Sequence, residues 1–280
     1  MIYIFTALFP EAKPLISHLG LKRSADQERF PVYTSPDQEF LLAVTGTGPV
    51  SAAIVSSYVF TCRKPQPSDH IVNVGVCAGL GTAQAGECYL CTSLGETDTG
   101  KSYYPDLLWK HSFPEAALFT GSRILSDPDD SSIAGYIDKD RPLLYDMEAT
   151  ALYQSASVYA GPHQMSFLKI VRDRADGHVP SAKEVSELVG KHLPAVLAYI
   201  DRLPDSAQEA PSLPMLEQLS EDLHCSVSMK YMLQQYLTWA ALSNSSPEEK
   251  IRQLYAAGTL PCKDRKEGKK ILEQLRSFLL

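Results

Sequence analysis

The 280-residue sequence has no long apolar run and only six cysteines. No stretch approaches the roughly 20 apolar residues that a membrane-spanning helix needs. The apolar N-terminus meets Glu11 and Lys13 too early for a signal peptide. The cysteines lack metal-ligand spacing, and we interpret them as reduced thiols. These absences predict a cytoplasmic protein that needs no metal and no other cofactor.

Positive charge is also scarce: 26 Lys and Arg residues stand against 33 Asp and Glu residues, a formal net charge of -7. Binding to nucleic acid depends on clustered cations that displace the counterions of the phosphates. The only basic cluster lies in the tail, at 263–270. We therefore expect a small-molecule ligand rather than a nucleic acid, and no membrane partner.

Short apolar runs alternate with helical patterns over the first 203 residues. Strands are predicted at 2–6, 30–34, 40–44, 71–76, 87–92, 117–120, 143–145 and 165–171. Helices are predicted at 10–19, 50–62, 147–160 and 182–203. This alternation predicts an α/β fold with a mixed, mostly parallel central sheet flanked by helices.

The composition changes at Pro204. Residues 204–214 contain several prolines and are predicted to be a linker. Residues 215–280 show helical patterns with apolar stripes throughout. We therefore predict an α/β domain at 1–203 and a small all-α appendage at 215–280.

Carboxylates follow several of the predicted strands: Glu11, Asp146 with Glu148, and Asp173. A glycine-rich segment, 75–81, is predicted to be a loop at another strand end. Open α/β folds bind small ligands at the carboxyl edge of the sheet, where these groups would share a cleft. On the residues alone, Glu148 could equally be a surface acid that caps a helix.

Five segments resemble the nucleoside phosphorylase superfamily in order and rough spacing. They are 2–16, Thr45-Gly-Thr-Gly-Pro-Val-Ser-Ala-Ala53, Asn73–Leu80, Tyr145-Asp-Met-Glu-Ala-Thr150 and Arg172-Asp-Arg-Ala-Asp176. Within the superfamily, residues 1–203 look closest to the methylthioadenosine/S-adenosylhomocysteine nucleosidases. The resemblance implies a homodimeric enzyme that hydrolyses the N-glycosidic bond of a purine or modified purine nucleoside through an oxocarbenium-like transition state.

The resemblance also implies roles for particular residues. Glu11 matches the carboxylate that orients and deprotonates the attacking water, and Asp173 matches the acid that protonates the leaving base. Glu148 matches the glutamate that binds the ribose hydroxyls, with Met147 packing on the sugar. Further substrate contacts are expected from Cys77, Ala78, Gly79, Ile124, Lys169 and Arg172.

Two positions bear on the nucleophile. Phosphorylases of the superfamily hold phosphate with arginines where this chain has Glu11 and Asn73, so water is the expected nucleophile. Two alternatives remain open at this stage: a phosphate-dependent phosphorylase, and a degenerate, non-catalytic nucleoside-binding or scaffold protein.

The chain departs from the nucleosidases at several site positions. Val76 and Arg172 stand where the nucleosidases have serine, and Lys169 where they have arginine. The region of the stacking phenylalanine aligns with Gly121–Ile124. A guanidinium beside Asp173 disfavours the protonated carboxyl, unless Arg172 points away or contacts the substrate.

Overall fold

The structure is a computed structural model that describes residues 1–25, 29–127, 130–176, 180–203, 213, 215–242 and 247–279. The chain divides into two compact units, residues 1–207 and 208–280, here called the α/β unit and the helical unit. This division falls inside the predicted linker 204–214, which lies outside the described residues except for Leu213.

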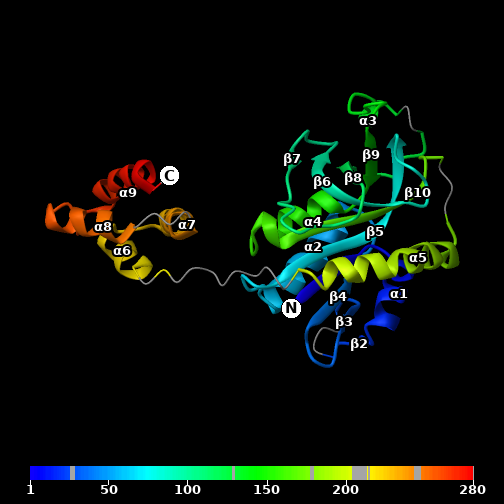
Figure 1. The fold of residues 1–280 in the computed structure, drawn as a ribbon, viewed down its shortest axis with the longest axis horizontal. Coiled ribbons are helices and arrows are strands. Elements are labelled where there is room, and N and C mark those ends of the chain that lie inside the picture. The colour runs from blue at the N-terminus through cyan, green and yellow to red at the C-terminus, as the bar shows by residue number, and fades with distance from the viewer. Residues whose placement is uncertain are drawn as a thin grey trace. The chain divides into compact units, whose positions relative to one another are not determined.

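The α/β unit contains one sheet and the helices around it (Figure 1). Its strands are β1 (Ile2–Thr6), β2 (Lys22–Arg23), β3 (Val32–Thr34), β4 (Phe40–Val44), β5 (His70–Gly81), β6 (Cys88–Glu96), β7 (Ser102–Tyr103), β8 (Glu115–Thr120), β9 (Pro142–Asp146) and β10 (Met165–Asp173). Its helices are α1 (Phe9–His18), α2 (Pro49–Cys62), α3 (Ser131–Ala134), α4 (Ala149–Ala156) and α5 (Ala182–Ile200), with a 3-10 turn at Pro162–Gln164.

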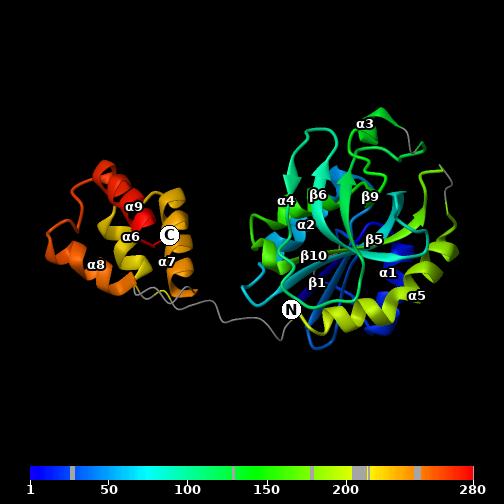
Figure 2. The ribbon, with the colours of Figure 1, turned by 45° about the horizontal axis from the view of Figure 1, so that its top comes forward.

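Side-chain alternation along the buried strands places helices on both faces of the sheet. In β1, Tyr3 and Phe5 share a core with residues of α2 and α4. Ile2 and Ile4 point the other way and share a second core with residues of α1 and α5. The sheet therefore lies between the α2–α4 pair and the α1–α5 pair, as the prediction required (Figure 2).

The sheet is mixed, as predicted, but it is not mostly parallel, which corrects that part of the prediction. Among the described strands, five pairings are parallel and five are antiparallel. β5 pairs with both β10 and β9, and the order β10-β6-β8-β9-β5 closes these strands into a ring. β1, β4, β3 and β2 continue from β5 as an open extension.

The glycine-rich segment 75–81 was predicted to be a loop, and this prediction is wrong. The segment forms the second half of β5. Ala78 to Gly81 pair antiparallel with β9, and Gly75 to Ala78 pair in parallel with β10. Apolar content alone predicted a strand only to Val76. The neighbouring strands supply hydrogen bonds that keep the glycine-rich half extended.

The helical unit has a hydrophobic core of its own. The described helices of this unit are α6 (Leu216–Asp222), α7 (Val227–Leu242), α8 (Pro247–Ala256) and α9 (Arg265–Leu279). The buried core includes Leu219, Leu233, Leu237, Ile251, Leu272 and Leu275. The apolar stripes seen in the sequence are therefore buried against one another. Among the described helices of the chain, none is both long and apolar enough to cross a lipid bilayer.

Candidate active site

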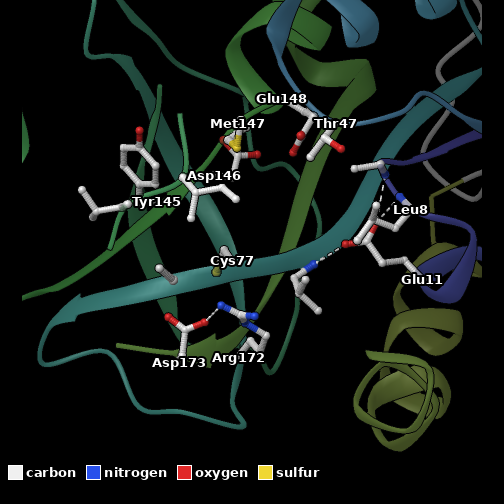
Figure 3. Close-up of a pocket in the computed structure, with 15 residues that line it drawn as sticks. Leu8, Glu11, Thr47, Cys77, Tyr145, Asp146, Met147, Glu148, Arg172 and Asp173 are labelled. Carbon is white, nitrogen blue, oxygen red and sulfur yellow. Dashed lines mark hydrogen bonds and ion pairs between the residues drawn. The ribbon is translucent and has the colours of Figure 1, made fainter. Parts of the chain in front are cut away.

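A pocket of about 130 Å³ lies at the carboxyl ends of several strands of the α/β unit (Figure 3). Its polar lining comes from five places: Glu11 in α1, Thr47 between β4 and α2, Asp146 at the end of β9, Glu148 before α4, and Arg172 with Asp173 at the end of β10. The carboxylates that follow the predicted strands therefore line one pocket at one edge of the sheet, as predicted.

The carboxylate of Glu11 is held by three backbone N–H groups. Its Oε2 accepts hydrogen bonds from the N–H groups of Ala7 at 2.9 Å and Leu8 at 2.8 Å. Its Oε1 accepts one from the N–H of Val76 at 2.8 Å. Burial raises the pKa of Glu11, and these hydrogen bonds and the charge of Lys169 oppose that effect. A carboxylate has about four lone-pair sites, so one site on Oε1 is left to accept a hydrogen bond from a ligand or a water.

Gly75 makes room for this arrangement. A Cβ added at Gly75 would lie 3.1 Å from Glu11 Oε1, which is closer than ordinary van der Waals contact. The absence of a side chain at this point of β5 therefore allows the Glu11 carboxylate to approach the strand and reach the N–H of Val76.

Glu148 is buried at the N-terminus of α4, but its side chain does not cap that helix. Its Oε1 accepts a hydrogen bond of 2.8 Å from the N–H of Gly48, in the glycine turn before α2. Burial, together with the charge of Asp146, raises the pKa of Glu148 to about 7, although Lys169 and the Gly48 hydrogen bond act in the opposite direction. The surface-cap interpretation of Glu148 is therefore wrong.

The raised pKa of Glu148 predicts a pH-dependent stability. The folded protein holds the proton more tightly than the unfolded chain, so this contribution is fully present below pH 4.5 and is lost as the pH rises through about 7. In Glu148→Gln it is absent. Urea unfolding from pH 5 to 8 should therefore show the free energy of unfolding of the wild type falling relative to the variant by roughly 2–3 kcal/mol. A pH-independent difference would refute this assignment.

Lys169, which does not line the pocket, forms a buried ion pair with Asp146, which does. Lys169 Nζ lies 2.7 Å from Asp146 Oδ2, and both side chains are almost completely buried. Asp146 Oδ2 also accepts the N–H of Ala149 at 3.0 Å, and Oδ1 accepts the Thr120 hydroxyl at 2.6 Å. Burial alone would lower the pKa of Lys169, but Asp146, Glu148 and Glu11 together raise it, so the side chain stays charged.

At the other end of the pocket, Arg172 contacts the carboxylate of Asp173 through Nη2 (Figure 3). The second carboxylate oxygen of Asp173, Oδ1, accepts the N–H of Ala175 at 2.7 Å. Arg172 therefore does not point away from Asp173. The guanidinium and the carboxylate form one paired group on the pocket wall.

The structure places most of the other predicted contacts in the pocket lining. Met147, Cys77, Ala78 and the exposed Ile124 line it. Gly79 and Lys169 do not line it, and their substrate contacts stay predictions. A Cβ on Gly79 would clash with Val171, and Lys169 is 1% exposed and directed at Asp146.

Sequence reasoning missed several residues that the pocket contains. They are Ala7, Leu8, Thr47, Leu125 and Tyr145 as lining residues. Thr47 lies in the segment Thr45–Ala53, which carries part of the family resemblance, so the sequence did contain a signal for it. Tyr145 precedes the Asp-Met-Glu motif, and its hydroxyl donates to the carbonyl of Arg123 at 2.8 Å. Nothing in the sequence pattern marks Leu125.

The charges of this site favour a cation in the pocket. Glu11, Asp146 and Glu148 surround one buried cation, Lys169, and the pair of Arg172 and Asp173 is neutral overall. In a site shielded from water, fixed carboxylates stabilise positive charge that develops on a bound molecule. The arrangement can therefore stabilise a positive charge on a bound molecule next to a carboxylate able to accept a proton.

No family model matches the chain, and no curated protein matches it by sequence. Solved structures match it with TM-scores just below 0.6. The methylthioadenosine nucleosidase of Arabidopsis thaliana is 21% identical, covers 75% of this chain and 96% of its own, and has a TM-score of 0.56. The methylthioadenosine/S-adenosylhomocysteine nucleosidase of S. pneumoniae is 16% identical, covers 72% of this chain and 98% of its own, and has a TM-score of 0.59. The enzyme of Campylobacter jejuni gives the same four values. The chain therefore has the nucleoside phosphorylase-like fold of the methylthioadenosine/S-adenosylhomocysteine nucleosidases.

Proposed function

We propose that the α/β unit hydrolyses the N-glycosidic bond of a purine or modified purine nucleoside, releasing the free base and the ribosyl sugar. The solved nucleosidases support the reaction class through the shared fold. The observation that carries the choice of water over phosphate is the environment of Glu11.

Three N–H groups, those of Ala7, Leu8 and Val76, converge on one point of the pocket wall and would suit an anion. The Glu11 carboxylate of the chain itself occupies that point. A phosphate there would lose these donors and meet a negative charge. Asn73, at the second phosphate-binding position of the phosphorylases, donates instead to the carbonyl of Phe5 at 3.0 Å and does not line the pocket. The site therefore favours water.

In this proposal, a water molecule donates a hydrogen bond to the remaining lone-pair site on Glu11 Oε1. It transfers that proton to the carboxylate as its oxygen attacks C1′ of the ribose. Glu148 binds the ribose hydroxyls, and Met147 packs on the sugar. The excess of buried carboxylates stabilises the oxocarbenium-like transition state. Each of these groups lines the same pocket.

The scaffold alternative rests on Val76 and Arg172, both of which stand where the nucleosidases have serine. The contact that Val76 makes with Glu11 comes from its backbone N–H, which any residue except proline supplies. Position 76 thus keeps its backbone contact with Glu11, although it lacks a hydroxyl, and this contact supports an enzyme over a non-catalytic relative.

A panel of purine nucleosides, incubated with the full chain and assayed for free base with and without phosphate, tests the proposal. We expect base release at the same rate in both conditions. Release that requires phosphate would establish the phosphorylase. No release from any member of the panel would support the non-catalytic alternative.

We also propose that the chain is a cytoplasmic homodimer. Helix α2 is apolar on nearly all sides, yet Val50 is 70% exposed and Ile54 53% exposed, and Val158, just after the neighbouring α4, is 75% exposed. An apolar face of this kind is typical of a surface buried by a partner. The six cysteines are free thiols, which supports a reducing compartment.

Light scattering should give the mass of two chains for the wild type and of one for Ile54→Glu; a monomeric wild type would contradict the homodimer.

A further inference from the structure

The pair of Arg172 and Asp173 lines the pocket at the end of β10. If the sugar lies between Glu11 and Glu148, as in the hydrolase proposed above, the leaving base extends toward this pair. Figure 3 shows Arg172 and Asp173 at one side of the pocket, with Glu11 and Glu148 toward the other. Of the described residues that line this pocket, Arg172 alone carries a positive charge. Its guanidinium is thus the strongest hydrogen-bond donor available to a base.

Asp173 is poorly arranged to donate a proton in this state. Oδ1 faces the N–H of Ala175 and Oδ2 faces the guanidinium of Arg172, so a proton on either oxygen would point at another donor. The contact with Arg172 favours the ionised carboxylate. Asp173 therefore acts here as an anion that fixes the direction of the guanidinium.

The edge of the base that carries N7 differs between purines. A 6-aminopurine presents a donor, the N6 amino group, beside the N7 acceptor, whereas a 6-oxopurine presents two acceptors, O6 and N7. A protonated carboxyl, with one donor and one acceptor, complements the first edge. A guanidinium, with parallel N–H donors, complements the second.

Building on the hydrolase proposed above, we propose that Arg172 selects the base and that the substrate is a 6-oxopurine nucleoside, with the guanidinium donating to O6 and N7. Asp173 is then a positioning residue that holds Arg172. The solved neighbours are named for methylthioadenosine, a 6-aminopurine nucleoside, so this chain would differ from them at the base.

The step balances without a proton from Asp173. As the C1′–N9 bond breaks, both of its electrons go to the base, whose negative charge spreads to N7 and O6 and is stabilised by Arg172. The water oxygen bonds to C1′ and its proton goes to Glu11. The base anion takes up a proton from solvent on release, and Glu11 returns its proton to solvent.

Matched substrate pairs test the selectivity. Inosine and adenosine, and their 5′-methylthio derivatives, differ only in the base, at position 6 and in the proton that the 6-oxopurine carries on N1. Because one bidentate contact discriminates by about 1–3 kcal/mol, kcat/KM should favour the 6-oxo member about 5- to 150-fold. Arg172→Gln should remove most of this ratio, and Asp173→Asn should reduce it. The matched control is Arg174→Gln, because Arg174 donates to the carbonyl of Gly81 at 2.9 Å and does not line the pocket.

A wild type that prefers the 6-amino member, or a ratio unchanged in Arg172→Gln, would overturn the inference while leaving hydrolysis intact. Calorimetry with the free bases hypoxanthine and adenine separates the two proposals further. If no nucleoside is cleaved, yet hypoxanthine binds at least tenfold more tightly than adenine in the wild type and not in Arg172→Gln, the selectivity stands and the hydrolase fails. Equal binding of both bases, with no cleavage, would overturn both.

Discussion

Glu11→Gln is expected to lower kcat for base release by about 10²- to 10⁴-fold, the usual contribution of a general base, while KM changes little. An amide cannot take the proton of the attacking water. The variant should also lose stability, because a glutamine presents its NH2 group to at least one of the three backbone N–H donors around Glu11. Leaving such a donor unpaired costs about 1–3 kcal/mol.

The two effects are separable by measurement. Kinetics at a temperature where circular dichroism shows both proteins folded give the loss in kcat, and urea unfolding gives the loss in stability. Glu187→Gln is the matched control, since its side chain is 67% exposed and pairs only loosely with Lys183, at 3.7 Å. A Glu11→Gln variant that retains the kcat of the wild type would show that Glu11 is not the base.

Lys169→Met is expected to lower the free energy of unfolding at neutral pH by about 3–5 kcal/mol, the cost of removing one partner of a buried ion pair. The substitution removes the cation 2.7 Å from Asp146 and leaves that carboxylate buried near Glu148 and Glu11. The pKa of Glu148 should then rise further, because Lys169 is one of the groups that lower it.

Lys183→Met provides the comparison, since Lys183 is 83% exposed and its replacement should change stability by less than about 0.5 kcal/mol. Adding Asp146→Asn to Lys169→Met should restore part of the lost stability, because the uncompensated charge is then gone. Equal stability of Lys169→Met and Lys183→Met in urea unfolding would contradict the buried pair.

Local sequence signals predicted the elements that position the carboxylates. The apolar run at Ile2–Thr6 and the switch from strand to helical spacing at Asp146–Glu148 correspond to β1 and to the β9–α4 junction. Because strand ends of an α/β sheet meet at one edge, the gathering of Glu11, Glu148 and Asp173 in one pocket followed from their places in the chain.

Contacts between distant parts of the chain were not predictable in this way. The second half of β5 is extended because β9 and β10 pair with it, and its glycines gave the opposite signal. Lys169 lies far from Asp146 in the sequence, and no spacing rule links a lysine within a strand to a carboxylate after another strand. The three N–H groups around Glu11 depend on backbone positions, so the side chain of Val76 carried no information about them.

Incubation of the full chain with its best purine nucleoside in ¹⁸O-labelled water, in the presence of phosphate, tests the central claim most directly. The hydrolase predicts free base together with a ribosyl product labelled with ¹⁸O at C1′. The labelled fraction should exceed the fraction that exchange alone gives when the same sugar is kept in the labelled water without enzyme. Ribose 1-phosphate as the product would contradict it.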